Sequence, residues 1–267
     1  MAIFYRAFSI FSAFFIAFFV WVATGFAQNQ SSLGVVLLHD KAGTPNGSIA
    51  KLANALRDKG YEVLTPSMPW ASGLIYSAGY DESLKLIGAE VQSLREKGVK
   101  NIVVAGHSMG GHMALAYAAM DPDLAGVVLL APSHYPETYA YVWKPVIDSL
   151  ELAKNLTARG WYAEKNYFND LDERKEMTVF AKPADYLSFC DPEGPSQLSN
   201  AVVSFRHSLP VLIISEKNPR LDPKTAIFDR LPKNNKNRFI QSKADHSNVP
   251  NETISDVLSW LKFLDIP

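Results

Sequence analysis

Short, continuous apolar runs alternate with amphipathic segments along most of the chain. The apolar runs are rich in Val, Ile and Leu, as in strands of a parallel sheet that is covered on both faces. The intervening segments place apolar residues three or four positions apart, which predicts helices. The predicted strands are 34–39, 61–65, 102–105, 125–130, 210–215 and 238–242, and the predicted helices are 48–59, 81–97, 112–120, 224–231 and 252–263. Asp81 is the expected cap of the second helix.

This alternation of strand and helix predicts an α/β fold with a mostly parallel central sheet and helices on both faces. The chain has 267 residues, of which 48% are hydrophobic, so it is long enough to bury one sizeable core. One interval, 133–207, breaks the rhythm because it contains no clear buried strand. It is instead rich in aromatic residues: Tyr135, Tyr139, Tyr141, Trp143, Trp161, Tyr162, Tyr167, Phe168, Tyr186 and Phe189.

The N-terminal segment has the pattern of a secretory leader. Arg6 precedes an uncharged apolar run over 7–27, which ends in Gly25-Phe26-Ala27 and is followed by polar residues. We expect a signal peptide over 1–27, cleaved after Ala27, and a single domain over 28–267. The rival interpretation is an uncleaved anchor at 7–27, because the apolar run is nearly long enough to span a bilayer. Either interpretation predicts an exported domain, periplasmic or secreted.

Residues 101–111 carry the most informative motif. An apolar strand runs into Gly106-His107-Ser108-Met109-Gly110, and a helical pattern follows at once. In this setting Gly-x-Ser-x-Gly forms a nucleophile elbow, whose tight turn holds the serine in a strained conformation. Side chains at Gly106 and Gly110 would collide across the turn. We therefore expect the Ser108 hydroxyl to stand clear of the sheet at a helix N-terminus.

The elbow and a distant histidine, His246, together make the chain resemble the α/β-hydrolase family. The order of the family's triad is nucleophile, acid, histidine, and Ser108 and His246 fit its first and last places. The resemblance covers residues 33–265 and implies the α/β-hydrolase fold, with a helical cap inserted at about 133–207. An alternative for the aromatic residues of this interval is a satellite core that never touches a ligand.

His246 is the best candidate for the base that activates Ser108, because it follows the last predicted strand. The other histidines are expected to have structural or supporting roles: His39, His107, His112, His134 and His207. The oxyanion needs two backbone donors, of which one is the amide of Met109. The resemblance makes Lys41 the second donor, although Asp40 replaces the family's glycine. A carboxylate near the oxyanion is unfavourable, so Asp40 should point away.

The acid of the triad departs from the family pattern. At the family position, after the second-last strand, this chain has Asn218 instead of aspartate. In one interpretation the Asn218 amide orients His246, as in Cys-His-Asn proteases. In a second, Asp222 or Glu216 reaches His246 from a shifted loop. In a third, the site is degenerate and the protein binds its ligand without catalysis.

Charge and motif spacing exclude several function classes. With 26 basic and 27 acidic residues, the chain lacks the basic excess expected of a nucleic-acid partner. The scattered histidines lack zinc-ligand spacing, and the glycines after Gly106 lack the ending of a phosphate loop. No metal and no cofactor are predicted. The expected partner is a small-molecule acyl substrate, and membrane contact is expected only through an uncleaved leader.

The leading hypothesis is a serine hydrolase that cleaves a carboxylic ester through an acyl-enzyme, with thioesters and amides left open. Ser108 is the nucleophile, His246 is the base, and Asn218 or Asp222 is the orienting residue. The alternative, motivated by Asn218 and Asp40, is a catalytically degenerate binding or scaffold protein with the same fold.

Overall fold

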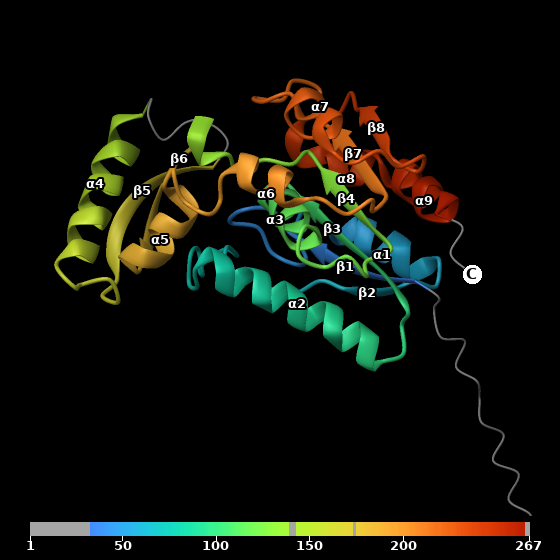
Figure 1. The fold of residues 1–267 in the computed structure, drawn as a ribbon, viewed down its shortest axis with the longest axis horizontal. Helices are drawn as coiled ribbons and strands as arrows, with labels where there is room; N and C mark the ends of the chain where they lie inside the picture. Colours follow the sequence, from blue (N-terminus) through green and yellow to red (C-terminus); the bar gives the residue numbers. More distant parts are fainter. Residues whose placement is uncertain (1–32, 139–142, 173–174, 265–267) are drawn as a thin grey trace, which may run out of the picture.

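The computed structural model describes residues 33–138, 143–172 and 175–264 (Figure 1). Within them, six strands form one sheet in the order β2-β1-β3-β4-β7-β8, and every neighbouring pair is parallel. The predicted parallel sheet is therefore confirmed. The strands are β1 (Leu33–Leu38), β2 (Glu62–Leu64), β3 (Asn101–His107), β4 (Gly126–Leu130), β7 (Val211–Ser215) and β8 (Arg238–Gln241).

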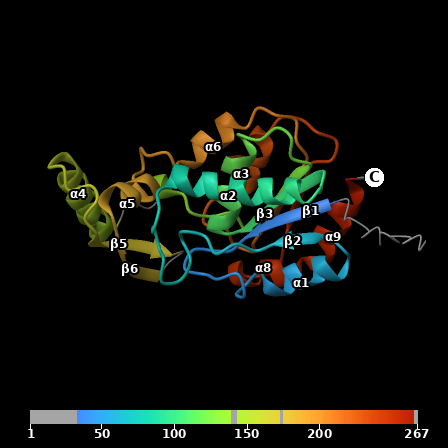
Figure 2. The same cartoon turned by 90° about the horizontal axis from the view of Figure 1, so that it is seen from below.

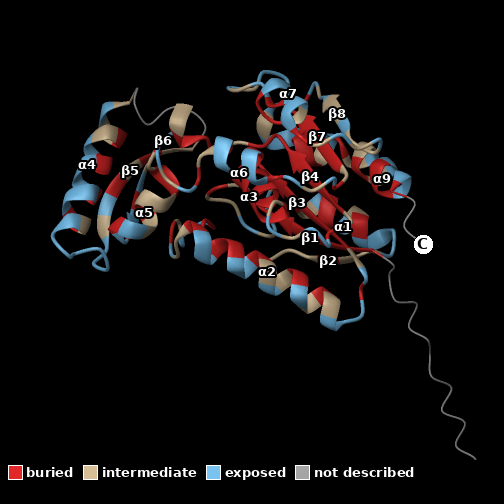
Figure 3. Cartoon of the chain, viewed as in Figure 1, coloured by how far each residue is buried: buried red, intermediate tan, exposed pale blue. Residues whose placement is uncertain are grey.

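Helices cover both faces of the sheet (Figure 2). Alternate residues of β1 point to opposite faces, so Val36 and Leu38 join one apolar core while Val35 and Leu37 join the other. Burial on both sides explains why the central strands are continuous apolar runs (Figure 3). One face carries α2 (Tyr80–Glu96), α3 (Met109–Ala118) and α6 (Leu198–Ser204), and the other carries α1 (Ala50–Asp58), α8 (Val249–Glu252) and α9 (Ile254–Phe263).

Three helix predictions need local correction. Gly79 is the N-cap of α2, so Asp81 lies in the first turn, where its charge still favours the helix dipole. The helix expected over 224–231 is the short α7 (Pro223–Ala226) followed by the 3-10 helix η2 (Phe228–Arg230). The helix expected over 252–263 divides at Thr253, whose hydroxyl donates to the Val249 carbonyl 2.7 Å away.

The interval 133–207, which we call the cap, is not purely helical, so the expectation of a helical insertion was wrong in this respect. It contains an antiparallel hairpin whose two strands are paired along their whole length. In the first of these strands, exposed Tyr167 precedes buried Phe168, but the next buried position is Asp170. A buried aspartate breaks the apolar alternation, so the strand was hidden in the sequence. The elements are η1 (Pro136–Thr138), α4 (Lys144–Ala158), β5 (Asn166–Asp172), β6 (Lys175–Ala181), α5 (Pro183–Cys190) and α6.

The aromatic residues of the cap are divided between core and surface. Phe168 stacks on Tyr186 with ring centroids 4.5 Å apart, and both rings are buried in the core that also covers one face of the sheet. Trp161, Tyr162 and Tyr167 are exposed. Tyr139 and Tyr141, like the predicted leader over 1–27, lie outside the described residues. Among the helices that are described, none is long and apolar enough to cross a membrane.

Candidate active site

The serine lies in a strained turn between β3 and α3. Ser108 has φ 55° and ψ −120°, a conformation that is costly for a residue with a side chain. The surrounding backbone holds it there. The Ser108 amide donates to the Leu130 carbonyl at 2.9 Å, and its carbonyl accepts from the amides of Gly111 at 2.9 Å and Ser133 at 3.1 Å. The elbow is thereby fixed to both β4 and the first turn of α3.

The two glycines of the motif are required by close backbone contacts. A Cβ on Gly106 would lie 2.1 Å from the carbonyl oxygen of Gly110, across the turn. A Cβ on Gly110 would lie 2.6 Å from the carbonyl oxygens of Leu38 and His39, at the end of β1. The predicted collision across the turn is therefore confirmed at Gly106. At Gly110 the collision is with the end of β1 instead, which limits how closely α3 packs on the sheet.

His246 and Glu216 form a hydrogen-bonded pair in the cavity that Ser108 lines. Glu216 directly follows β7, and His246 opens the 3-10 helix η3 (His246–Asn248) after β8. His246 Nδ1 lies 2.8 Å from Glu216 Oε2, and both side chains are largely buried, at 11% and 17% exposure. With Nδ1 donating to the carboxylate, Nε2 is the nitrogen that can accept a proton. Ser108, His246 and Glu216 line the same cavity.

The other two candidates for the orienting residue lie elsewhere. Asn218 is exposed and lines the cavity. The carboxylate of Asp222 caps α7, where it accepts from the Lys224 amide at 3.0 Å. The structure thus brings Glu216, the alternative from the shifted loop, to His246. This carboxylate stands two residues earlier than the family spacing, so motif alignment alone did not select it.

The two predicted oxyanion donors come from different segments of the chain. Met109 is the first residue of α3, where backbone amides have no partner within the helix. Lys41 lies in the loop after β1, and both residues line the cavity together with Ser108. The Lys41 side chain leaves the site, because its Nζ contacts Asp170 Oδ2 and the Leu171 carbonyl, each at 2.8 Å.

Asp40 is turned away from the cavity, as expected. Its Oδ1 accepts a hydrogen bond from Ser48 Oγ at 2.6 Å and lies 3.7 Å from His107 Nδ1. Burial raises the pKa of this carboxyl, but the nearby His107 ring and the hydrogen bond from Ser48 outweigh that effect and hold the pKa at about 2. Asp40 is therefore ionised at neutral pH. Its side chain contacts Ser48 and does not line the cavity.

His107 has a supporting role that the sequence indicated only in general terms. Its Nε2 donates to the backbone carbonyl of His246 at 2.9 Å, and the two rings are 5.1 Å apart. The elbow therefore supports the loop that carries the candidate base. Nothing in the spacing of the two histidines could have revealed this contact, since 139 residues separate them.

Two further histidines are buried around the elbow. His112 lies one turn into α3, and burial lowers its pKa to about 4. His134 donates from Nε2 to the Phe189 carbonyl at 3.0 Å, and burial followed by the nearby Lys41 charge lowers its pKa well below the usual value. Both are neutral at pH 7, and His134 also lines the cavity.

The cavity over Ser108 has a volume of about 330 Å³, at the small end for ligand sites. Part of its wall comes from the cap hairpin, which the sequence pattern did not reveal. In the described part of the chain, no cluster of three or more His, Cys, Asp or Glu side chains could hold a metal ion. Beyond the residues already placed, the wall includes Pro132, Ser133, Tyr135, Thr138, Leu171, Asp172, Lys175, Pro219, Arg220 and Leu221.

The chain is similar to proteins of known structure. Among solved structures, one reported for the metagenome-derived lipolytic enzymes LipS and LipT is 19% identical, with a TM-score of 0.63, over 88% of this chain and 94% of that chain. The monoacylglycerol lipase of Paleococcus ferrophilus is 21% identical, with a TM-score of 0.64, over 86% and 94%. A soluble variant of the monoglyceride lipase of Saccharomyces cerevisiae is 17% identical, with a TM-score of 0.59, over 89% and 88%.

At these identities, the likeness to solved structures establishes the fold. No curated protein sequence matches the chain. The model of the alpha/beta hydrolase family matches residues 35–253, which is most of the chain. The protein belongs to the alpha/beta hydrolase family.

Proposed function

We propose that the protein is a serine hydrolase that cleaves carboxylic esters through an acyl-enzyme. Ser108 is the nucleophile, His246 the general base and Glu216 the residue that orients and charge-stabilises His246. The amides of Met109 and Lys41 bind the oxyanion. The hydrogen bond of 2.8 Å between His246 Nδ1 and Glu216 Oε2 is the observation that carries this proposal.

This pair also favours an enzyme over a degenerate binding protein. The binding hypothesis rested on Asn218, a neutral amide at the family's acid position. Glu216 supplies the charged acceptor that a neutral amide lacks, and it does so within the cavity that contains Ser108. A carboxylate stabilises the imidazolium form of His246 far better than an amide does.

The proposed reaction has two half-reactions. Ser108 Oγ attacks the ester carbonyl carbon, His246 Nε2 takes the hydroxyl proton, and the oxyanion rests on the two amides. Collapse of this intermediate breaks the ester bond, and His246 returns the proton to the leaving alcohol. A water molecule then attacks the acyl-enzyme, with His246 again as base, which releases the carboxylic acid and restores Ser108.

The cavity supports a small acyl ester as the substrate. Its volume of about 330 Å³ accommodates a short or medium acyl chain, and Met109, Leu171 and Leu221 offer apolar contacts. Thioesters and amides would use the same machinery, because the fold does not determine the leaving group. An exported location, with residues 1–27 as the leader, remains part of the proposal.

The proposal is tested by labelling the purified protein with a fluorophosphonate, with intact mass and peptide mapping as the readout. We expect one adduct on Ser108, absent from Ser108→Ala and strongly slowed in His246→Ala. Folded wild-type protein that takes no label would support the binding hypothesis. A panel of p-nitrophenyl esters, thioesters and anilides of matched acyl length then identifies the preferred bond.

A further inference from the structure

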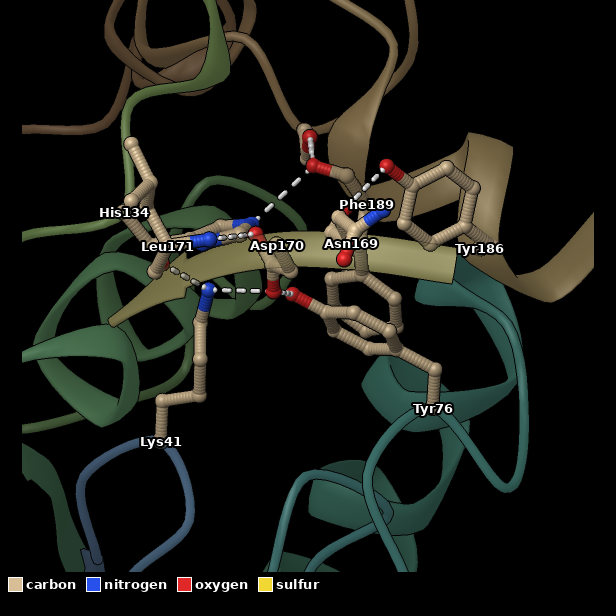
Figure 4. A network of polar contacts seen from close by, with 9 residues as sticks. Lys41, Tyr76, His134, Asn169, Asp170, Leu171, Tyr186 and Phe189 are labelled. Carbon is tan, nitrogen blue, oxygen red and sulfur yellow. Dashed lines mark hydrogen bonds and ion pairs between the residues drawn. The ribbon is translucent and has the colours of Figure 1, made fainter. Parts of the chain in front are cut away.

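Lys41 connects the active site to the cap through a buried ion pair. Its backbone belongs to the loop after β1, while its side chain reaches strand β5 of the cap hairpin (Figure 4). Nζ lies 2.8 Å from Asp170 Oδ2 and 2.8 Å from the Leu171 carbonyl oxygen. The two side chains are only 3% and 0% exposed. One residue therefore lines the cavity at Ser108 and is anchored in the cap.

Tyr76 completes this network from a third segment of the chain. Its hydroxyl donates to the same Asp170 Oδ2 at 2.6 Å, and the Leu171 amide donates to Asp170 Oδ1 at 2.7 Å. Both oxygens of the carboxylate are thus engaged. Tyr76 is fully buried, has φ 58° and stacks on Phe189 with ring centroids 4.8 Å apart. A non-glycine residue in this conformation is held there by its surroundings, so the hydroxyl has a fixed place.

A buried ion pair is an inefficient way to stabilise a fold. Removing two charges from water is costly, and apolar residues of similar volume often stabilise as well or better. Such a pair does fix geometry, because each charge must stay within hydrogen-bond distance of its partner. Because the Lys41 side chain is held by this ion pair, the backbone of its loop, which faces Ser108, is held as well.

We propose that the Lys41–Asp170–Tyr76 network positions the oxyanion loop, by tying the Lys41 side chain to β5 and so holding the Lys41 amide toward Ser108. This inference rests on the proposed function. Leu171 and Lys175 of the same hairpin line the cavity. A substrate that contacts the hairpin therefore contacts the element that holds the amide, which links the fit of the substrate to the alignment of the oxyanion site.

The test is a double-mutant cycle with Lys41→Met, Asp170→Asn and the combined variant. Methionine is of similar length and has no charge, and the Lys41 backbone amide is retained in every variant. Loss of one oxyanion donor costs about 10²–10³ in kcat, so we expect a misplaced donor to cost about 10–100-fold. KM for p-nitrophenyl butyrate should change less than about threefold. Because the two side chains act as one unit, the double variant should lose no more than the worse single variant.

A pair of inhibitors separates positioning from general damage. Ser108 adds to the carbonyl carbon of a trifluoromethyl ketone, which gives a tetrahedral adduct with an oxyanion. The methyl ketone of the same acyl chain binds mainly as a mimic of the ground state. We expect the variants to lose affinity for the first in proportion to their loss of kcat, and to keep their affinity for the second. Arg95→Met is the matched control, because it breaks the ion pair of 3.0 Å between Arg95 and Asp121. It should lower Tm without lowering kcat.

Tyr76→Phe provides a milder variant should the ion-pair variants fail to fold. It removes one hydrogen bond from Asp170 and keeps the ion pair, so kcat should fall severalfold with KM unchanged. If wild type is labelled at Ser108 but kcat of the folded variants stays within twofold, or only KM rises, the positioning inference is overturned and the proposed function stands. If wild type takes no label and cleaves no ester, both are overturned.

Discussion

Replacing Glu216 by Gln tests the central pair of the proposed site. The substitution keeps the size and shape of the side chain and removes its charge. In the wild type, Oε2 of Glu216 accepts from His246 Nδ1 at 2.8 Å, between side chains that are 17% and 11% exposed. Glutamine can still accept at this position, but it no longer stabilises the imidazolium that forms when His246 takes the Ser108 proton.

The size of the effect follows from this geometry. Two unit charges about 4 Å apart attract by about 4 kcal/mol at an effective dielectric constant of about 20, which corresponds to a factor of about 10³ in rate. Partial exposure of the pair makes the expected loss of rate smaller. If the glutamine instead presents its NH₂ group to His246, it favours the wrong tautomer of the ring and the loss becomes larger. Loss of the acid in a serine protease costs about 10⁴. We therefore expect kcat for p-nitrophenyl butyrate to fall by about 10²–10⁴, with KM changed less than about threefold.

Two further variants make the result specific. Asp222→Asn should keep kcat within about twofold of wild type, because Asp222 caps α7 and is exposed. Asn218→Asp in the Glu216→Gln background should not restore activity. The reasoning is refuted if Glu216→Gln retains more than half of the wild-type kcat, or if Asn218→Asp rescues it. Circular dichroism and Tm of each variant check that the fold is kept.

Three further predictions concern the elbow, its support and stability in acid. Gly106→Ala should lower the free energy of unfolding by more than about 4 kcal/mol or prevent folding, because its Cβ would lie 2.1 Å from a backbone oxygen; a wild-type Tm would contradict this. His107→Phe keeps a ring but loses the donor to the His246 carbonyl, so kcat should fall about 10–100-fold, and an unchanged kcat would show that this contact does not hold the base. Burial lowers the pKa of His112 to about 4, so between about pH 6.5 and 4 the unfolded chain binds more protons than the folded one. The free energy of unfolding should therefore fall by about 3 kcal/mol as pH drops through this range. Urea titrations should show a smaller fall for His112→Gln. A fall equal to that of the wild type would show that His112 is not the source of the pH dependence.

The sequence predicted the central sheet well because its strands carry a strong physical signal. Strands buried on both faces, such as β3 and β4, must be continuously apolar, and their short length and valine content favour a strand over a buried helix. The elbow was equally clear, because backbone contacts at Gly106 and Gly110 leave no room for a side chain. At both places the packing allows only a narrow choice of residue type, so the residue type in the sequence indicates the packing.

The cap and the orienting acid were less predictable for a common reason. Asp170 is polar at a fully buried position, because its charge is matched by Lys41 from a distant segment, and local patterns carry no trace of that partner. Glu216 reaches His246 because β7 and β8 end side by side, whereas the family motif places the acid by its spacing along the chain. Both features depend on contacts between segments that only the folded chain brings together.

The hairpin has a consequence for how such a protein diverges. Neighbouring positions of β5 have separate duties, since Asp170 anchors Lys41 while Leu171 and Asp172 form part of the cavity wall. Natural variation at the wall positions can change which esters fit and leave the anchor intact. Variation at Asp170 favours a compensating change at Lys41, because either charge alone would be buried without an opposite charge. Among related proteins, we expect positions 41 and 170 to change together. We expect positions 171, 172 and 175 to vary with the substrate that each protein binds.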